Sequence, residues 1–327
     1  MATSPEASDI ALDRAGLVSQ MSRLLSDWGA GDAPDLYSLI DACTSDYGEA
    51  GFEAFLQRAR KTGATWGFHP SDPLARSVSR AIMGRVVLDG SALDDTGRLD
   101  VARERPAVFL GNHLSFVDVN VLDYLMADAG YGDVSSILTT LVGPKVYTHP
   151  VRRLASMTFG TIKMPQSTSR ASGEAVMSAR EVAKIARGIF EAADERLKAG
   201  EHLLVFPEGS RSRDGAMQPC LAAVARYLGH PDAVVVPFGL AGCEKLVPLE
   251  EDHAHPCIVR GRIGVPVPAA KLLERAGGRR ERAMHIVGYL IADTLPIEYR
   301  GAYDRDASAG DPRLDEARDL ADELSGR

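Results

Sequence analysis

The stretch AVFLGNHLSFVD, residues 107–118, runs from an apolar segment into a turn that carries a histidine and an aspartate. Its first four residues have the short, wholly apolar character of a buried strand. His113 and Asp118 are five positions apart, which on a regular helix places them about 140° from each other around the axis. If the strand ends near Asn112 and a helix begins near Ser115, His113 lies before the helix and can fold back to meet Asp118. That pair predicts a general base and the carboxylate that orients it.

Short apolar segments alternate with longer helical patterns on both sides of this stretch. The predicted strands are AVFLGN (107–112), SSILTTLV (135–142), GTIKM (160–164), HLLVFPEG (202–209), AVVVPFGL (233–240) and CIVRGRIGV (257–265). A long amphipathic helix is predicted within residues 173–200, with Ile185, Ile189 and Leu197 on its apolar face. Such alternation predicts an α/β fold, a mixed sheet flanked by helices, with its chemistry at the strand ends.

Residues 1–88 read as a different kind of region. Four segments have apolar residues at helical spacing, beginning with Leu17, Met21 and Leu25, and they predict a small helical N-terminal domain. The α/β domain then spans residues 89–300. Residues 301–327 are an acidic tail with one helix predicted from Pro312 to Leu324, to which we assign no function.

Composition excludes several classes of protein. The chain has 327 residues, of which 45% are hydrophobic and 25% charged, as in an ordinary globular protein. Its apolar runs are shorter than the roughly 18–20 residues that span a bilayer, and its first residues lack the pattern of a signal peptide. The four cysteines are scattered without C-x-x-C spacing, which indicates a reducing cytoplasm and argues against a zinc site. A net charge of −8 argues against nucleic acid as a partner.

The acidic residues are unevenly distributed. Residues 134–173 contain no aspartate or glutamate, yet they include Lys145, Arg152, Arg153, Lys163 and Arg170. The block predicts a cationic face for an anionic ligand, although a solvated loop whose counter-charges come from elsewhere in the fold would look the same.

A second stretch decides how the first is interpreted. SFVD (115–118) is also a capping-box pattern, so Asp118 could simply cap a helix. However, LLVFPEGSRSRDG (203–215) is an apolar strand that leads into Pro-Glu-Gly and then two arginines, Arg211 and Arg213. Gly209 allows close approach of the backbone, and planar guanidinium groups are suited to binding a phosphate with two hydrogen bonds.

Together these residues resemble the glycerophospholipid acyltransferase family, which includes the glycerol-3-phosphate and 1-acylglycerol-3-phosphate O-acyltransferases. NHLSFVD (112–118) matches its block N-H-x4-D, so the resemblance implies that His113 is the catalytic base and that Asp118 orients it. FPEGSRS (206–212) matches F-P-E-G-T-R-S with serine for threonine, a block associated with the acceptor's phosphate. The implied substrate-binding residues are Glu208, Gly209, Ser210, Arg211 and Arg213.

Two further blocks are matched less evenly. VVPFGLAG (235–242), with Pro237, resembles the fourth block. FGTIKMPQS (159–167) stands where the second block belongs, but Gln166 occupies the place at which the family often has an arginine. Lys163 or Arg170 would substitute for it in substrate binding, and the identity of the acceptor depends on this departure.

The resemblance implies O-acyl transfer in phospholipid synthesis. The donor would be an acyl thioester of acyl carrier protein or coenzyme A, and the acceptor the hydroxyl of glycerol-3-phosphate or 1-acylglycerol-3-phosphate. No cofactor and no metal is implied, and a cytoplasmic enzyme could contact the inner face of the membrane peripherally. The main alternative is the same chemistry on an acceptor without phosphate, such as an amino lipid or a secondary metabolite.

Other classes fit the residues less well. The chain has no G-x-S-x-G nucleophile elbow of a serine hydrolase, although acylation of Ser115 beside His113 is a conceivable route. A metal-dependent phosphohydrolase would need further His and Asp ligands near the motif. A binding module that had lost its chemistry would not need both His113 and Asp118.

Overall fold

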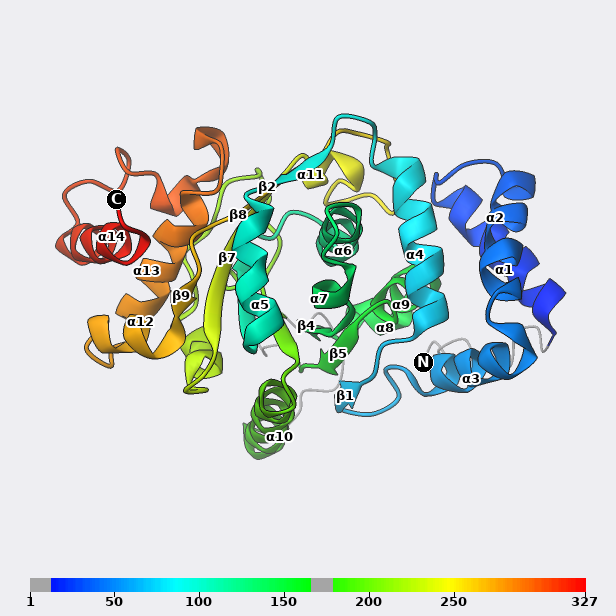
Figure 1. Ribbon diagram of the computed structural model, residues 1–327, viewed down its shortest axis with the longest axis horizontal. Coiled ribbons are helices and arrows are strands. Elements are labelled where there is room, and N and C mark those ends of the chain that lie inside the picture. Colours follow the sequence, from blue (N-terminus) through cyan, green and yellow to red (C-terminus); the bar gives the residue numbers. More distant parts are fainter. Residues whose placement is uncertain (1–12, 166–178) are drawn as a thin grey trace.

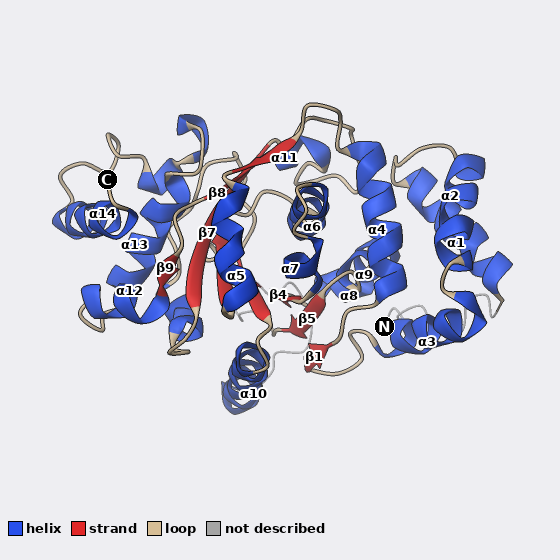
Figure 2. Cartoon of the chain, in the orientation of Figure 1, coloured by secondary structure: helices blue, strands red, loops and turns tan. Residues whose placement is uncertain are grey.

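The computed structural model describes residues 13–165 and 179–327. Within these ranges the strands form one nine-stranded sheet in the order β1-β5-β4-β6-β3-β7-β8-β2, with β9 paired to β7 (Figures 1 and 2). The pairings from β5 through β7 are parallel. Strand β1 is antiparallel to β5, and both β8 and β9 are antiparallel to β7. The predicted mixed sheet flanked by helices is therefore confirmed. The strands are β1 (Gly67–His69), β2 (Ala92–Asp94), β3 (Ala107–Gly111), β4 (Leu138–Val142), β5 (Gly160–Lys163), β6 (His202–Val205), β7 (Val234–Ala241), β8 (Arg260–Ile263) and β9 (Val267–Pro268).

The side chains of β3 point alternately to two hydrophobic clusters, one on each face of the sheet. Ala107 and Phe109 belong to the first cluster, and Val108 and Leu110 to the second, because successive residues of a strand face opposite sides. The first cluster includes residues of α4 (Pro73–Val86) and α6 (Asp118–Asp128). The second includes residues of α10 (Ala179–Lys198), α12 (Ala269–Arg275) and α13 (Arg280–Ala292). The strand that leads to the His113–Asp118 turn is thus buried on both sides.

Three more helices precede α4: α1 (Arg14–Asp27), α2 (Ala33–Ser45) and α3 (Gly48–Lys61). All four helices were predicted from their apolar spacing, and Leu17, Met21 and Leu25 are buried. Their buried residues belong to the same hydrophobic cluster as α6 and the first face of the sheet. The helical region is therefore packed against the sheet region, and the boundary at residue 88 stays a prediction.

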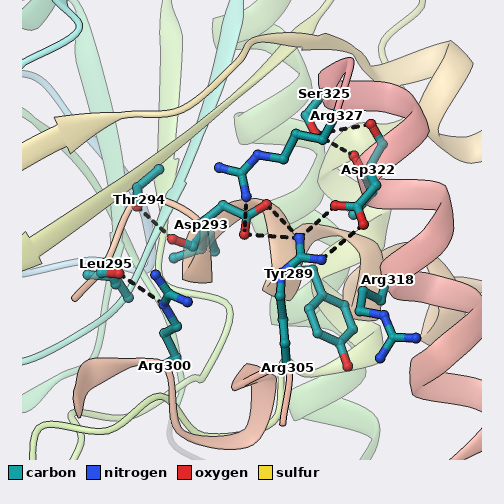
Figure 3. A network of polar contacts seen from close by, with 12 residues as sticks. Tyr289, Asp293, Thr294, Leu295, Arg300, Arg305, Arg318, Asp322, Ser325 and Arg327 are labelled. Carbon is teal, nitrogen blue, oxygen red and sulfur yellow. Dashed lines mark hydrogen bonds and ion pairs between the residues drawn. The ribbon is translucent and has the colours of Figure 1, made fainter. Parts of the chain in front are cut away.

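The C-terminal residues pack on the opposite side of the molecule (Figure 1). Helix α14 (Pro312–Ser325) lies against α13, with Ala317 and Ala321 fully buried. Arg305 joins the two helices, because its guanidinium pairs with Asp293 at the end of α13 at 3.1 Å and with Asp322 of α14 at 2.6 Å (Figure 3). Residues 301–327 are thus anchored to the helices that cover the second face.

Short helices connect the remaining segments. They are η2 (Thr96–Leu99), α5 (Asp100–Glu104), α7 (Gly132–Ser136), α8 (Lys145–Thr148), α9 (Pro150–Ser156), η3 (Ala222–Leu228), α11 (Cys243–Leu246), η4 (Ile297–Tyr299) and η5 (Gly301–Tyr303). Among the helices in the described ranges, none combines the length and the apolar character that a bilayer-spanning segment needs.

Candidate active site

His113 lies in the turn between β3, which ends at Gly111, and α6, which begins at Asp118. Its Nδ1 is 2.9 Å from Oδ2 of Asp118, as the spacing of the two residues predicts. The Asp118 side chain is fully buried, whereas 21% of the His113 side chain is exposed. A neutral imidazole that donates through Nδ1 carries its lone pair on Nε2. The geometry therefore suits His113 to accept a proton from a ligand.

Asp118 also holds the backbone of the turn. Its carboxylate accepts hydrogen bonds from the amides of Leu114, at 2.7 Å, and Ser115, at 2.9 and 3.0 Å. The Ser115 contact is the bond that the capping-box interpretation expects from the acidic residue, but the hydroxyl of Ser115 donates to the carbonyl of Val247 at 3.4 Å instead. One carboxylate thus fixes both the turn and the ring of the histidine.

The segment after β6 supports His113 from the neighbouring strand. The rings of Phe206 and His113 are stacked, with centroids 4.0 Å apart and an interplanar angle of 8°. The amide of Ser212 donates to the carbonyl of His113 at 2.7 Å. Because β3 and β6 are adjacent parallel strands, their carboxyl ends meet at one edge of the sheet. The two sequence blocks therefore form one site.

Glu208 also links the two blocks. It is 3% exposed, and its two oxygens accept from the amides of His113 at 2.8 Å and Gln218 at 2.7 Å. Burial raises the pKa of Glu208 to about 7, against the lowering effect of these two bonds. The sequence analysis grouped Glu208 with the substrate-binding residues, but these contacts are with the backbone of the site. They make it a positioning residue.

The fourth block is joined to the first by Asn112. Its side chain donates to the carbonyl of Leu240 in β7 and accepts from the amide of the same residue, both at 2.9 Å. The amide group thereby continues the ladder between β3 and β7 beyond the last paired residue, Gly111. These two bonds therefore hold the residue that immediately precedes His113 against β7.

Two arginines flank the ring of Phe116, within the His113–Asp118 turn. The Cζ of Arg152, on α9, is 4.7 Å from the ring centroid, and that of Arg211 is 6.0 Å away. Arg152 also pairs with Asp252. In the part of the chain that the structure describes, Nε of Arg152 and Nη1 of Arg211 are buried and have no hydrogen-bond partner.

The charges around Arg211 favour an anion there. Burial lowers the pKa of Arg211, and the neighbouring charge of Arg152 lowers it further, while Asp118 and Asp252 act in the opposite direction. Two partly buried like charges with unmet donors are stabilised by a group that supplies acceptor oxygens and negative charge. Phosphate is such a group.

The other predicted binding residues are placed differently. Gly209, in the turn after Pro207, has a φ of +70°, a conformation that favours glycine. Gly209 and Arg213 are exposed, and Ser210 is half-buried. Lys163 is the last residue of β5. Two strands, β4 and β6, lie between β5 and β3, so β5 is about 14 Å from β3 at the usual strand spacing. Its Nζ donates to the carbonyl of Gly63 at 2.6 Å. Arg170 and Gln166 lie outside the described residues.

Comparisons with known proteins agree with this geometry. Residues 93–241, which include β3, β6, β7 and the His113–Asp118 turn, match the family model described as "Acyltransferase". Residues 93–241 are a domain of the acyltransferase family. The chain is 24% identical over 145 residues to the 1-acyl-sn-glycerol-3-phosphate acyltransferase BAT2, chloroplastic, of Brassica napus, a match covering 44% of this chain and 36% of the relative. The chain therefore spans about a third of that relative's length.

A solved structure is also similar to this chain. It is the 1-acyl-sn-glycerophosphate (LPA) acyltransferase PlsC from Thermotoga maritima, with 16% identity and a TM-score of 0.47. The alignment covers 79% of this chain and 86% of that chain.

Sequence reasoning missed Arg152 as a residue of the candidate site. It noticed the residue only as part of the acid-free segment, and α9 was not predicted because its seven residues are too few for a periodic pattern. It also missed the stacking role of Phe206. Among the described residues no cluster of three or more His, Cys, Asp or Glu side chains could hold a metal ion.

Proposed function

We propose that this chain transfers an acyl group from an acyl thioester to the hydroxyl of glycerol-3-phosphate or 1-acylglycerol-3-phosphate. The donor would be a thioester of acyl carrier protein or coenzyme A. The observation that carries the acceptor's identity is the pair Arg152 and Arg211, whose unmet donors lie beside the ring of Phe116, two residues from Asp118. The name of the curated relative indicates the same class of acceptor.

The reaction follows from the His113–Asp118 pair. Nε2 of His113 takes the proton of the acceptor's hydroxyl while that oxygen attacks the carbonyl carbon of the thioester. Asp118, bonded to Nδ1, stabilises the resulting imidazolium. The tetrahedral intermediate then collapses, the C–S bond breaks, and the departing thiolate takes the proton back from His113. A positioned base of this kind contributes about 10²–10⁴ in rate.

The arginines contribute by holding the acceptor. A phosphate bound by Arg152 and Arg211 fixes the attached glycerol near the base, which replaces a random encounter by a positioned one. Synthesis of phospholipid also implies a membrane close by, because a 1-acylated acceptor is a lipid. Peripheral contact with the cytoplasmic face of a membrane is therefore part of the proposal.

An acceptor screen tests the proposal. The purified protein is given one acyl thioester, and thiol release is measured with glycerol-3-phosphate, its 1-acyl form, and the corresponding phosphate-free alcohols. We expect turnover only with a phosphate-bearing acceptor. Equal turnover with a phosphate-free alcohol would favour the alternative, the same chemistry on an amino lipid or a secondary metabolite.

Variants of the arginines sharpen the test. A charge-assisted hydrogen bond contributes about 1.5–3 kcal/mol net, so Arg211→Ala should raise the acceptor's KM about 10- to 150-fold and change use of the donor much less. Arg211→Lys should restore only part of the loss, because an ammonium lacks the planar fork. Arg153→Ala is the matched control, since this neighbour of Arg152 on α9 donates to Ala59 instead. An unchanged acceptor KM in Arg211→Ala would make this arginine structural.

A further inference from the structure

The segment 297–303, which contains η4 and η5, is bonded to the loop 206–221 that joins β6 to η3. The carbonyl of Tyr299 accepts from the amide of Met217 at 2.9 Å, and the amide of Ala302 donates to the carbonyl of Met217, also at 2.9 Å. Met217 is 1% exposed, so its amide and its carbonyl depend on these two partners. The middle of the loop is therefore held by residues that follow α13.

Two tyrosine hydroxyls of the same segment extend these contacts. The hydroxyl of Tyr303 accepts from the amide of Cys220 at 2.8 Å. The hydroxyl of Tyr299 donates to Oε1 of Glu244 at 2.7 Å and accepts from the amide of Gly242, just after β7, at 3.2 Å. Strands β6 and β7 are the two neighbours of β3 in the sheet. One segment thus joins the loops on both sides of β3.

The segment is itself fixed to the end of α13. Nε of Arg300 donates to the carbonyl of Leu295 at 3.0 Å, and Arg305, two residues after the segment, pairs with Asp293 (Figure 3). The residues of α13 are mostly buried. Because these contacts tie the segment to a core helix, it can serve as a fixed support for the loop 206–221.

The residue after Met217 links this support to the proposed base. The amide of Gln218 donates to one oxygen of Glu208 at 2.7 Å, and the other oxygen of Glu208 accepts from the amide of His113 at 2.8 Å. Displacement of Met217 would move Gln218 with it and would break the bond that fixes Glu208. The position of His113 therefore depends on the support of Met217.

The residue before Met217 links the same support to the proposed acceptor site. The carbonyl of Ala216 accepts from the hydroxyl of Ser212 at 2.8 Å, and Ser212 directly follows Arg211. Displacement of Met217 would therefore also shift the backbone that carries Arg211. Both substrates meet groups that this loop positions, but the contact with the acceptor's phosphate depends on it most directly.

We propose that residues 299–303 are a positioning segment of the site, which fixes Met217 and through it both His113 and Arg211. The proposal rests on the proposed acyl transfer. It gives a role to residues well beyond 241, the last residue that matches the family model. A change in the segment should lower kcat and raise the acceptor's KM, whereas a loss of stability alone would leave the KM of the folded protein unchanged.

Gly301→Ala tests the proposal. Gly301 has a φ of +49°, and an added Cβ would overlap the carbonyl oxygen of Met217. Since carbon and oxygen atoms of this kind normally lie about 3.3 Å or more apart, the two segments must separate by about 1 Å. A misplacement of about 1 Å lowers the rate about 10²-fold. We expect that loss in kcat/KM for the acceptor, with the donor's KM changed less than about twofold.

Gly310→Ala is the matched control. Gly310 also has a positive φ, of +94°, but no atom of the described structure lies within 4 Å of an added Cβ. It should keep kcat/KM within about twofold of the wild type. If Gly301→Ala does not fold, Tyr299→Phe replaces it, since the loss of the hydroxyl bonds to Glu244 and Gly242 should raise the acceptor's KM roughly 2- to 10-fold. A wild-type acceptor KM in the folded variant would overturn the proposal.

Amide hydrogen exchange tests the support without any substrate. In Gly301→Ala, peptides that cover residues 206–221 should exchange at least tenfold faster than in the wild type, whereas Gly310→Ala should leave them unchanged. Unchanged exchange in Gly301→Ala would refute the support even if activity falls. If exchange rises as expected but the wild-type protein acylates no acceptor, the proposed function fails and the support of the loop stands.

Discussion

Replacement of Asp118 by asparagine is the sharpest test of the proposed catalytic pair, because it exchanges one oxygen of a fully buried side chain for an NH₂ group. The carboxylate accepts from Nδ1 of His113 and from the amides of Leu114 and Ser115. An asparagine has one acceptor oxygen. If its NH₂ replaces Oδ1, it opposes only the Ser115 amide, which keeps its 2.9 Å bond to the other oxygen. If it replaces Oδ2, it faces the histidine and forces the imidazole into the opposite tautomer.

Both placements lower the rate, since neither leaves a negative charge to stabilise the imidazolium. The second placement also moves the proton to Nε2, so the ring can no longer act as a base. We expect kcat to fall about 10²–10⁴-fold, the contribution of a positioned base. The loss of charge-assisted bonds should lower the free energy of unfolding by about 1.5–3 kcal/mol.

Asp123→Asn provides a matched control on the same helix. Asp123 is 1% exposed, and its carboxylate accepts two bonds from Arg80, both at 2.8 Å. The substitution should lower the free energy of unfolding by a similar amount, yet leave kcat within about twofold. In the described hydrogen-bond network, Asp123 contacts no residue of the His113–Asp118 turn. Thiol release gives kcat, and urea unfolding gives stability. Near wild-type kcat in folded Asp118→Asn, or an equal loss of kcat in the control, would refute the assigned role.

Two further predictions concern the order of events and the pH dependence of stability. Because Ser115 is buried and bonded to a carbonyl, acyl thioester alone should release no stoichiometric burst of thiol, and steady-state kinetics should show a ternary complex; an acylated Ser115 peptide would contradict this. For Glu208, the native state holds its proton up to pH about 7 and the unfolded state only to about 4.5. Unfolding free energy should therefore fall by about 3 kcal/mol as pH rises through this window. Urea unfolding measured across this pH range tests the prediction. The Glu208→Gln variant should lose this pH dependence of the unfolding free energy. If the variant keeps the same slope as the wild type, Glu208 is already ionised in the native state.

The sequence predicted those parts of the fold that have a strong local signal. The six predicted strands are β3 to β8. Runs of apolar residues mark strands such as β3, β6 and β7, which are buried on both faces. Strands β1, β2 and β9 were missed, since two or three residues at the edges of the sheet show no alternation. Their pairing is set by the strands next to them rather than by their own side chains.

The same division holds for the site. His113 and Asp118 could be predicted, because a turn between strand and helix brings them together within five residues. Arg152 could not, since its contact with Phe116 depends on how a seven-residue helix folds back over the turn. For Glu208 the sequence predicts contact with substrate, and its burial and its two amide bonds, which no sequence pattern carries, favour a positioning role instead.

Helix α9 joins the proposed acceptor site to the hydrophobic core. Residues two positions apart on a helix point about 200° from each other, so Arg152 and Leu154 face opposite sides of α9. Arg152 contacts the ring of Phe116 and has an unmet donor, while Leu154 packs against the first hydrophobic cluster. The packing of Leu154 therefore holds the helix that positions Arg152, and the place of this arginine depends on the core as much as on its own contacts.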